Sequence, residues 1–297
     1  MIKKHTFSGY HPAINFVFFV MATVCGMIFM HPAFLLCSAL AAVTFTFTVR
    51  GKTAGKLLQG VLLLFLMISA INPIFNPRGK IILFTYWGRP YTAEALFYGM
   101  AIGGMMVSVL FWFSSYNAIM TSDKFTYLFG GVMPSATLLL TMVLRFVPTY
   151  RRKIRQIGYA RASIGKGISA GKRRALAENG LTILSALTSW ALEASIITSD
   201  SMRSRGYGTG KRGRFAQYRF IGRDRMLLGG MLLLSLIIIT CAAEGAATVS
   251  YTPHLQMTPL KDPRLIVGLS AYAIFLFLPT ALYIREEITW HILKSRI

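Results

Sequence analysis

The chain has 297 residues, of which 54% are hydrophobic and only 14% are charged, and its net charge is +22. A soluble domain carries roughly 25% charged residues, so the composition argues against a soluble protein and indicates a membrane protein. Cytoplasmic loops of membrane proteins are rich in Lys and Arg, and this tendency explains the charge without nucleic acid as a partner.

Six segments are apolar over the length of about 20 residues that a helix needs to cross the hydrocarbon core of a bilayer. They are 13–30, 32–49, 57–75, 93–116, 226–246 and 265–284. If six helices alternate in direction, then Lys3, Lys4, Arg50, Lys52 and Lys56 all lie on one side. The positive-inside rule makes that side the cytoplasm and places both termini there.

A basic region separates the fourth segment from the fifth. From Arg145 to Arg225 the chain has 18 Lys and Arg against 4 Asp and Glu, so this region contributes 18 − 4 = +14 of the net charge of +22. We therefore expect an all-α integral membrane protein of about six transmembrane helices in three parts. These are a membrane block at 1–117, a cytoplasmic or interfacial module of amphipathic helices at 118–225, and a membrane block at 226–297.

Within the central module, residues 123–147 are apolar but interrupted by Gly130, Gly131 and Pro134. They form either a seventh span or one or two amphipathic helices at the membrane surface. After Pro148 the pattern predicts a basic helix at 150–164, a turn at 165–174 and a second helix at 175–205. We expect the second helix to be too polar to span, because Glu178, Glu193 and Asp200 would each cost a few kcal/mol at mid-bilayer.

No catalytic or nucleotide-binding motif is recognisable. Residues Gly167–Lys172 are one residue short of a phosphate-binding loop and are followed by Arg173, and the five His are scattered without metal-ligand spacing. We therefore expect no enzymatic activity, no resident metal and no cofactor of the chain's own.

The end of the second helix carries the most informative residues. Arg203 and Arg205 lie in its last turn, and Gly206 is a natural helix stop, followed by Tyr207 and Gly208. Two guanidinium groups at a helix end, beside a Gly-rich turn, are typical of an anchor for an acidic partner.

These residues resemble the transmembrane T component of energy-coupling factor (ECF) transporters, which are ABC-type importers of vitamins and related micronutrients in prokaryotic membranes. The strongest part runs from Glu193 to Gly208, where Ser204-Arg205-Gly206 matches an arginine motif twelve residues after a Glu. Supporting matches are His11-Pro12, Asn72-Pro73, Arg78-Gly79 and Arg145-Phe146-Val147-Pro148.

The resemblance implies a non-catalytic scaffold with two arginine motifs, each inserted into one of two ATPase subunits, and a small membrane-embedded S component that binds the substrate. ATP is then bound by the partner subunits. The first motif departs from the family pattern: its arginine position is Ile164, and we expect Arg161, one helical turn earlier, to supply the cation. The predicted docking residues are Arg205, Ser204, Gly206, Arg203, Arg161, Ala160 and Ala162, supported by Glu193, Gly165 and Pro148.

Two other functions remain open from the residues alone. A stand-alone secondary transporter would favour ionisable residues within its spans and an internal repeat, and few such residues and no clear repeat are found. A membrane-tethered nucleic-acid binder would use the basic region, but its acidic interruptions and apolar face argue against this function.

Overall fold

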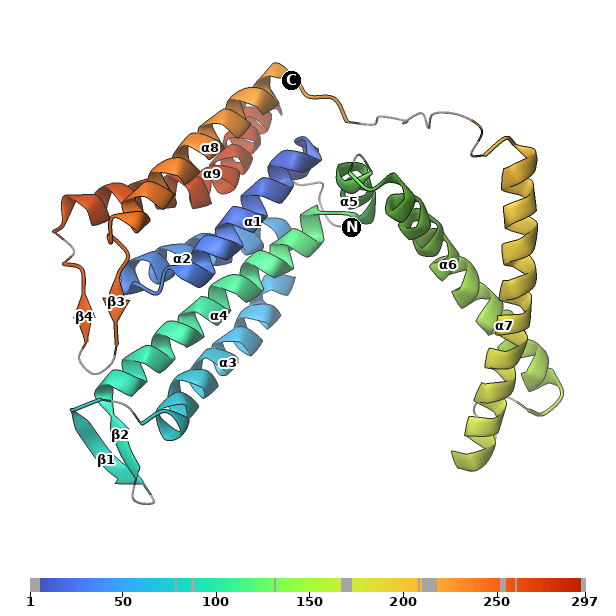
Figure 1. The fold of residues 1–297 in the computed structure, drawn as a ribbon, viewed down its shortest axis with the longest axis horizontal. Coiled ribbons are helices and arrows are strands. Elements are labelled where there is room, and N and C mark those ends of the chain that lie inside the picture. The colour runs from blue at the N-terminus through green and yellow to red at the C-terminus, as the bar shows by residue number, and fades with distance from the viewer. Residues whose placement is uncertain are drawn as a thin grey trace. The chain divides into compact units, whose positions relative to one another are not determined.

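The computed structural model describes residues 6–77, 79–86, 89–130, 132–166, 173–207, 209, 218–251, 255–259 and 261–294. They form long helices and two short β-hairpins (Figure 1). The chain divides into two compact units: the larger lies within 1–125 and 218–297, and the smaller within 126–217. Each unit is described by itself.

Six long helices form the larger unit, after a short 3-10 helix η1 (Thr6–Gly9). They are α1 (Pro12–Ile28), α2 (Pro32–Arg50), α3 (Thr53–Phe75), α4 (Ala93–Ile119), α8 (Gly222–Ala243) and α9 (Pro263–Lys294). Each corresponds to one of the six predicted segments, and α3 and α9 continue through internal prolines at Pro73 and Pro279. The prediction of an all-α membrane protein is confirmed.

Aromatic side chains form the centre of this bundle. The ring of Phe18 on α1 lies 5.4 Å from Phe7, 5.5 Å from Trp112 and 5.3 Å from Phe275, between ring centroids. All four side chains are almost completely buried. Aromatic pairs at these separations add favourable contacts beyond the apolar area that they bury, so this cluster joins η1, α1, α4 and α9.

The outer faces of the bundle helices are apolar too. Leu63 and Leu66 on α3 are 68% and 59% exposed, and Leu233 and Leu236 on α8 are 61% and 63% exposed. A helix that is hydrophobic all round belongs in a membrane or in a large core. The described residues of the unit leave these side chains exposed, as expected of helices that face lipid.

Contacts at the two ends of the bundle establish the alternating direction of its helices. At one end, Arg50 donates to the Ser114 carbonyl oxygen at 3.0 Å, and the Arg223 guanidinium lies 4.2 Å from the centre of the Tyr10 ring. At the other end, Tyr251 donates to the Met30 carbonyl oxygen at 2.6 Å. We call the end that carries Arg50 and Arg223 the basic end.

Two antiparallel hairpins lie at the end opposite the basic end, and neither was predicted. Strand β1 (Ile82–Tyr86) pairs with β2 (Arg89–Thr92) between α3 and α4, and β3 (Val249–Ser250) pairs with β4 (Gln256–Met257) between α8 and α9. Figure 1 shows the first hairpin beyond the ends of α3 and α4. Strands this short leave no clear period-2 pattern in a sequence.

The smaller unit is built from two long helices, α6 (Pro134–Ser163) and α7 (Arg173–Ser204), and α5 (Ser122–Phe129) leads into it. The expected boundary at Pro148 is wrong, because α6 continues through it, from the apolar part of 123–147 into the basic helix predicted for 150–164. Proline removes one backbone donor, and the Thr149 hydroxyl lies 3.5 Å from the Arg145 carbonyl oxygen in that turn.

By length and composition, α7 meets the requirement for a membrane span, contrary to the polarity expected of it. Among the described residues, the helices long and apolar enough to cross a membrane are α2, α3, α4, α7, α8 and α9, whereas α1 is shorter, with 17 residues. Glu178 and Asp200 lie near the ends of α7, so Glu193 is the one charged residue between them. Length and composition therefore do not exclude α7 from a membrane.

Candidate functional site

The α6 and α7 helices run antiparallel and contact each other at three levels. Near the end of α6, Arg161 donates through Nη2 to the Asn179 side-chain oxygen at 2.8 Å. In the middle, the Tyr150 and Trp190 rings meet edge to face at 5.7 Å, and Lys153 Nζ lies 5.2 Å from the centre of the Trp190 ring. At the third level, a groove lies between the two helices near the end of α7. These contacts define one crossing pair of helices (Figure 1).

The arginine motif lies in the C-cap of α7. Gly206 has φ +74°, its amide donates to the Arg203 carbonyl oxygen at 3.0 Å, and the Tyr207 amide donates to Met202 at 3.1 Å. These two bonds constitute a Schellman motif, in which the positive φ favours glycine. Arg205 is the residue before this glycine, its side chain is exposed, and within the described part of the chain it has no polar partner.

The end of α6 has the same geometry. Gly165 has φ +74°, its amide donates to Ala162 at 3.0 Å, and the Lys166 amide donates to Arg161 at 2.9 Å. Ile164 therefore occupies the position in this cap that Arg205 occupies in the other, as the motif comparison predicted. Ile164 is 69% exposed, so the end of α6 presents an apolar side chain where the end of α7 presents a guanidinium.

Arg161 is turned away from this tip. Its guanidinium is half-buried and bonded to Asn179 on α7, and its Nε is buried without a hydrogen-bond partner. Its geometry is that of a contact between the two helices. Its predicted role as the substitute cation stays a prediction.

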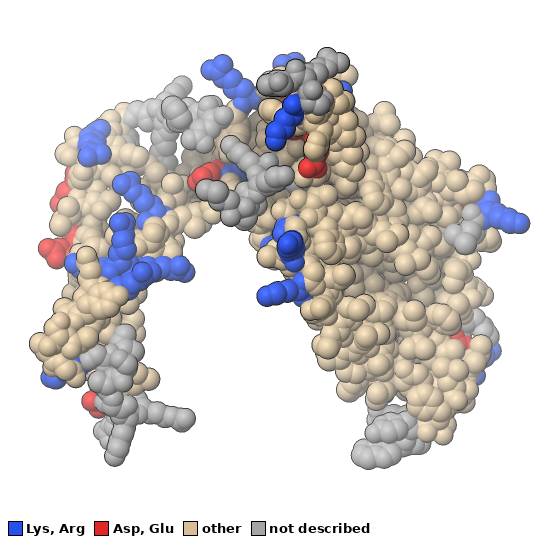
Figure 2. Space-filling model, turned by 180° about the vertical axis from the view of Figure 1, so that it is seen from behind, with Lys and Arg blue, Asp and Glu red and all other residues tan. Residues whose placement is uncertain are grey.

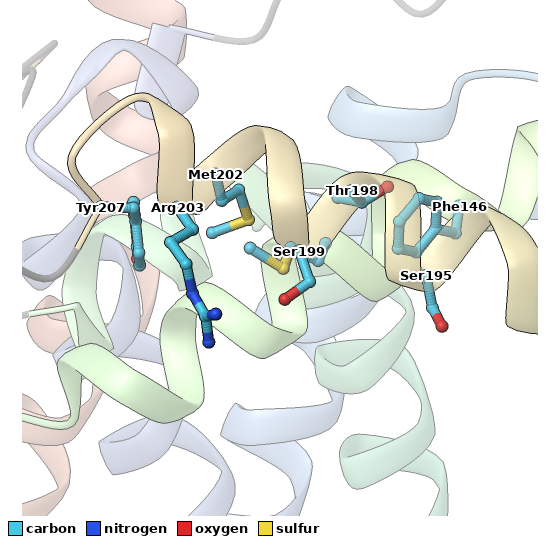
Figure 3. A pocket seen from close by; sticks show the side chains of 8 residues that line it. Phe146, Ser195, Thr198, Ser199, Met202, Arg203 and Tyr207 are labelled. Carbon is cyan, nitrogen blue, oxygen red and sulfur yellow. The ribbon is translucent and has the colours of Figure 1, made fainter.

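A groove between α6 and α7 was not predicted from the sequence. It has a volume of ≈ 370 Å³ and lies beside the cap of α7 (Figure 3). Its lining residues are Met142, Phe146, Ser195, Thr198, Ser199, Met202, Arg203 and Tyr207. The Ser195 and Thr198 hydroxyls donate to the α7 backbone, so they are left as acceptors in the groove. No pattern in the sequence pointed to it, because only the pairing of the two helices brings its lining residues together.

The other predicted site residues lie on the outside of the pair. Ala160 and Ala162 are exposed beside the cap of α6, Ser204 is exposed beside that of α7 and donates to the Ser201 carbonyl oxygen at 2.9 Å, and Pro148 is exposed within α6. Glu193 is exposed on α7, and the described residues provide its carboxylate with no ion pair. Gly208 and the Gly167–Lys172 segment lie outside the described residues.

Charge and apolar surface alternate on this unit. Figure 2 shows Lys and Arg gathered along its helices, whereas the visible face of the larger unit is mostly uncharged. Between the charges, Leu139 and Val143 on α6 are 62% and 57% exposed, and Leu192 and Ile196 on α7 are 62% and 63% exposed. Apolar surface of this extent marks contact with a membrane or a protein partner. No group of three metal-ligating side chains is found in the described part of the chain.

The comparisons with known proteins agree with this arrangement. A sequence profile of the family described as CbiQ, cobalt transport protein, matches residues 6–216. The match covers more than half of the chain and includes α1 to α7 with both caps. A search of curated proteins finds no match.

Proposed function

Since the chain belongs to the CbiQ family, which is the membrane component of cobalt and ECF-type transporters, we propose that it is the coupling scaffold of such an importer. In this role it transmits ATP-driven movements of two ATPase subunits to a substrate-binding S component in a prokaryotic plasma membrane. It carries out no catalysis itself, and ATP is bound by the ATPase subunits. The observation that supports this proposal best is the exposed Arg205 at the cap of α7, whose side chain has no polar partner among the described residues.

The chemistry of Arg205 suits an anchor that must transmit force. A guanidinium keeps its charge and presents five donors in a planar fork, which matches a carboxylate at two points. The Schellman motif fixes the backbone from which the side chain extends. Removing one member of a desolvated charge pair costs about 2–5 kcal/mol, because the other charge is left buried and unpaired.

The separation of the two caps suits two ATPase subunits. Arg161 contacts Asn179 near the start of α7, and the groove residue Met202 lies near its end, so the two caps lie at opposite ends of the helix pair. At 1.5 Å per residue, the 23 positions from 179 to 202 correspond to roughly 35 Å along α7. A single small domain has a similar diameter, so the caps would contact different subunits.

We further propose that the two contacts differ in chemistry. The cap of α7 docks through Arg205, with Ser204, Gly206 and Arg203 beside it. The cap of α6 docks through the exposed Ile164, flanked by Ala160 and Ala162, and Arg161 either supplies a cation or holds the helices together. The apolar surfaces of α6 and α7 then face the S component or lipid, and the S component selects the transported substrate.

The test is co-purification of the ATPase subunits with the Arg205→Glu variant. We expect at least a tenfold loss of ATPase binding, because a carboxylate would face the partner's acidic group, and a matching loss of ATP-driven uptake. Arg225→Glu is the matched control, since Arg225 is exposed at the start of α8 in the other unit and its reversal changes the net charge equally. Binding that survives in Arg205→Glu, or that is lost equally in the control, contradicts the anchor assignment.

A further inference from the structure

The hairpin of β1 and β2 has an apolar surface that the described residues of the bundle leave exposed. The four consecutive side chains Ile81, Ile82, Leu83 and Phe84 are 62%, 57%, 54% and 53% exposed. A strand that packs one face on a core alternates between buried and exposed side chains. Here four consecutive side chains are exposed without alternation, so the described residues leave both faces accessible from outside the chain.

Several contacts hold the hairpin rigidly at the ends of α3 and α4. The buried Glu94 carboxylate at the start of α4 accepts from the amides of Lys80 and Ile81, at 3.1 Å and 3.2 Å. The Ala93 amide donates to the Ile81 carbonyl oxygen at 3.0 Å. A side chain at Gly79, where φ is +146°, would collide with Glu94. The apolar side chains are therefore displayed from a fixed position and do not belong to a loose loop.

The position of the hairpin along the bundle agrees with the boundary of a bilayer. From Leu57, the first apolar residue after Lys56, about 20 residues of helix span the hydrocarbon core of about 30 Å and end near Asn76. The hairpin follows a few residues later. Ile71, Ile74 and Phe75 at the end of α3 are 40%, 40% and 72% exposed, so its apolar surface continues the lipid-facing surface of that helix.

The backbone of the hairpin restricts how deep it can lie. It is a two-stranded sheet with a bulge between Ile82 and Phe84, and both outer edges leave N–H and C=O groups without a strand partner. Such edges are not tolerated in hydrocarbon, where unsatisfied backbone groups cost several kcal/mol each. The headgroup region supplies water and polar groups to the edges while the apolar side chains reach the acyl chains. Tyr91, whose ring stacks on that of Phe84 at 4.4 Å between centroids, is of a residue type that is enriched at that depth.

We propose that the β1–β2 hairpin is an interfacial anchor, which inserts Ile81 to Phe84 into the headgroup boundary of the leaflet opposite the basic end. Its binding partner is phospholipid. The anchor fixes the depth of α3 and α4 in the membrane. It lies at the end of the bundle opposite the two connections to the smaller unit. The proposal is independent of ATPase docking, since it depends on the larger unit alone.

The test is photo-crosslinking of the full-length protein in its native membrane, with p-benzoylphenylalanine in place of Phe84 or, separately, of Leu83. We expect phospholipid adducts at both positions by mass spectrometry, in a yield similar to that from the lipid-facing position Leu63 on α3. Photolysis with the same residue in place of Lys166, an exposed cation beside the cap of α6, is the matched control, and we expect it to give far less lipid adduct.

Crosslinking of both positions to a protein overturns the proposal and identifies the hairpin as a protein-docking surface. The absence of any adduct at both positions, while Leu63 reacts, also overturns it, because the hairpin would then lie in water. Each substitution in the hairpin replaces one exposed apolar side chain by another, so we expect the fold to be kept, and an unchanged thermal stability of each variant verifies this.

Discussion

At the scale of single residues, Lys124 on α5 is a buried charge that several contacts hold in the larger unit. It is 4% exposed, and its Nζ donates to the Ser8 carbonyl oxygen at 2.6 Å, to the Ser8 hydroxyl at 3.0 Å and to the Ile119 carbonyl oxygen at 3.2 Å. Ile119 ends α4, so the ammonium also lies at the negative end of that helix. The Lys124 side chain thus connects α5, which leads to the smaller unit, with Ser8 in the N-terminal segment and with the end of α4.

Replacement of this ammonium will destabilise the bundle. In Lys124→Met the buried acceptors of Ser8 and Ile119 lose a charged donor, which costs about 2–4 kcal/mol in the free energy of unfolding. The thermal midpoint of the detergent-solubilised protein will fall accordingly. Lys56→Met is the matched control, because Lys56 is exposed at the same end and its replacement will change stability by less than about 0.5 kcal/mol. Equal losses in the two variants would show that the contacts of Lys124 contribute nothing.

The sequence predicted some of these residue roles and missed others for physical reasons. The equivalence of Ile164 and Arg205 was predictable, because each precedes a glycine that ends a helix. That glycine adopts a positive φ in both caps. The contacts of Lys124 were not predictable, since two of its three acceptors named above are backbone oxygens, and the positions of all three depend on tertiary packing. For the same reason the bond between Arg161 and Asn179 required the pairing of α6 with α7.

At the scale of elements, the six bundle helices were predictable because a bilayer requires long apolar runs, and no tertiary contact is needed to recognise them. The failures occurred where a local rule was overridden. Pro148 was taken as a helix boundary, but α6 continues through it. The charges of α7 were taken to exclude a span, although all but Glu193 lie near its ends. The β1–β2 hairpin was missed because its strands have only 5 and 4 residues.

The two caps allow a direct exchange of docking chemistry between elements. Ile164→Arg places a guanidinium at the position in the α6 cap that Arg205 has in the α7 cap. If an acidic group of the ATPase faces this cap, the variant will bind the ATPase subunits more tightly by about 1–3 kcal/mol, as a charge-assisted hydrogen bond provides. The affinity of the detergent-solubilised variant for the purified ATPase subunits measures this effect.

Ser163→Arg is the matched control for that variant, because Ser163 is the exposed neighbour in the last turn of α6 and points in another direction. We expect it to leave the affinity unchanged. Weaker binding of Ile164→Arg would instead indicate that the partner receives the cap of α6 in an apolar pocket, and the cation prediction for this end would then be wrong.

At the scale of the whole molecule, the distribution of Lys and Arg distinguishes the two ends of the bundle. The basic end carries Arg50, Lys52, Lys56, Lys124, Arg219, Arg223, Arg225 and Lys294. The opposite end carries fewer cations, of which Arg264 lies 3.7 Å from Glu244 in an exposed pair that contributes little energy. The chain leaves the larger unit after Phe125 and returns at Tyr218, on the side of Lys124 and Arg223. The orientation of the basic end therefore determines which aqueous compartment the connections of the α6–α7 unit face.

The positive-inside rule predicts that the basic end faces the cytoplasm, where ATPase subunits have ATP. A fluorescent protein fused after Ile297 will then fluoresce, whereas alkaline phosphatase fused there will be inactive, because that enzyme requires the oxidising exterior for its disulfides. An epitope inserted after Lys261, at the opposite end, will be accessible to antibody on cells whose outer envelope is permeabilised and whose plasma membrane is intact. Active phosphatase at the C-terminus would reverse the orientation, and the cap of Arg205 could then not serve cytoplasmic ATPases. The same fusions thus test the topology and a necessary condition of the coupling proposal.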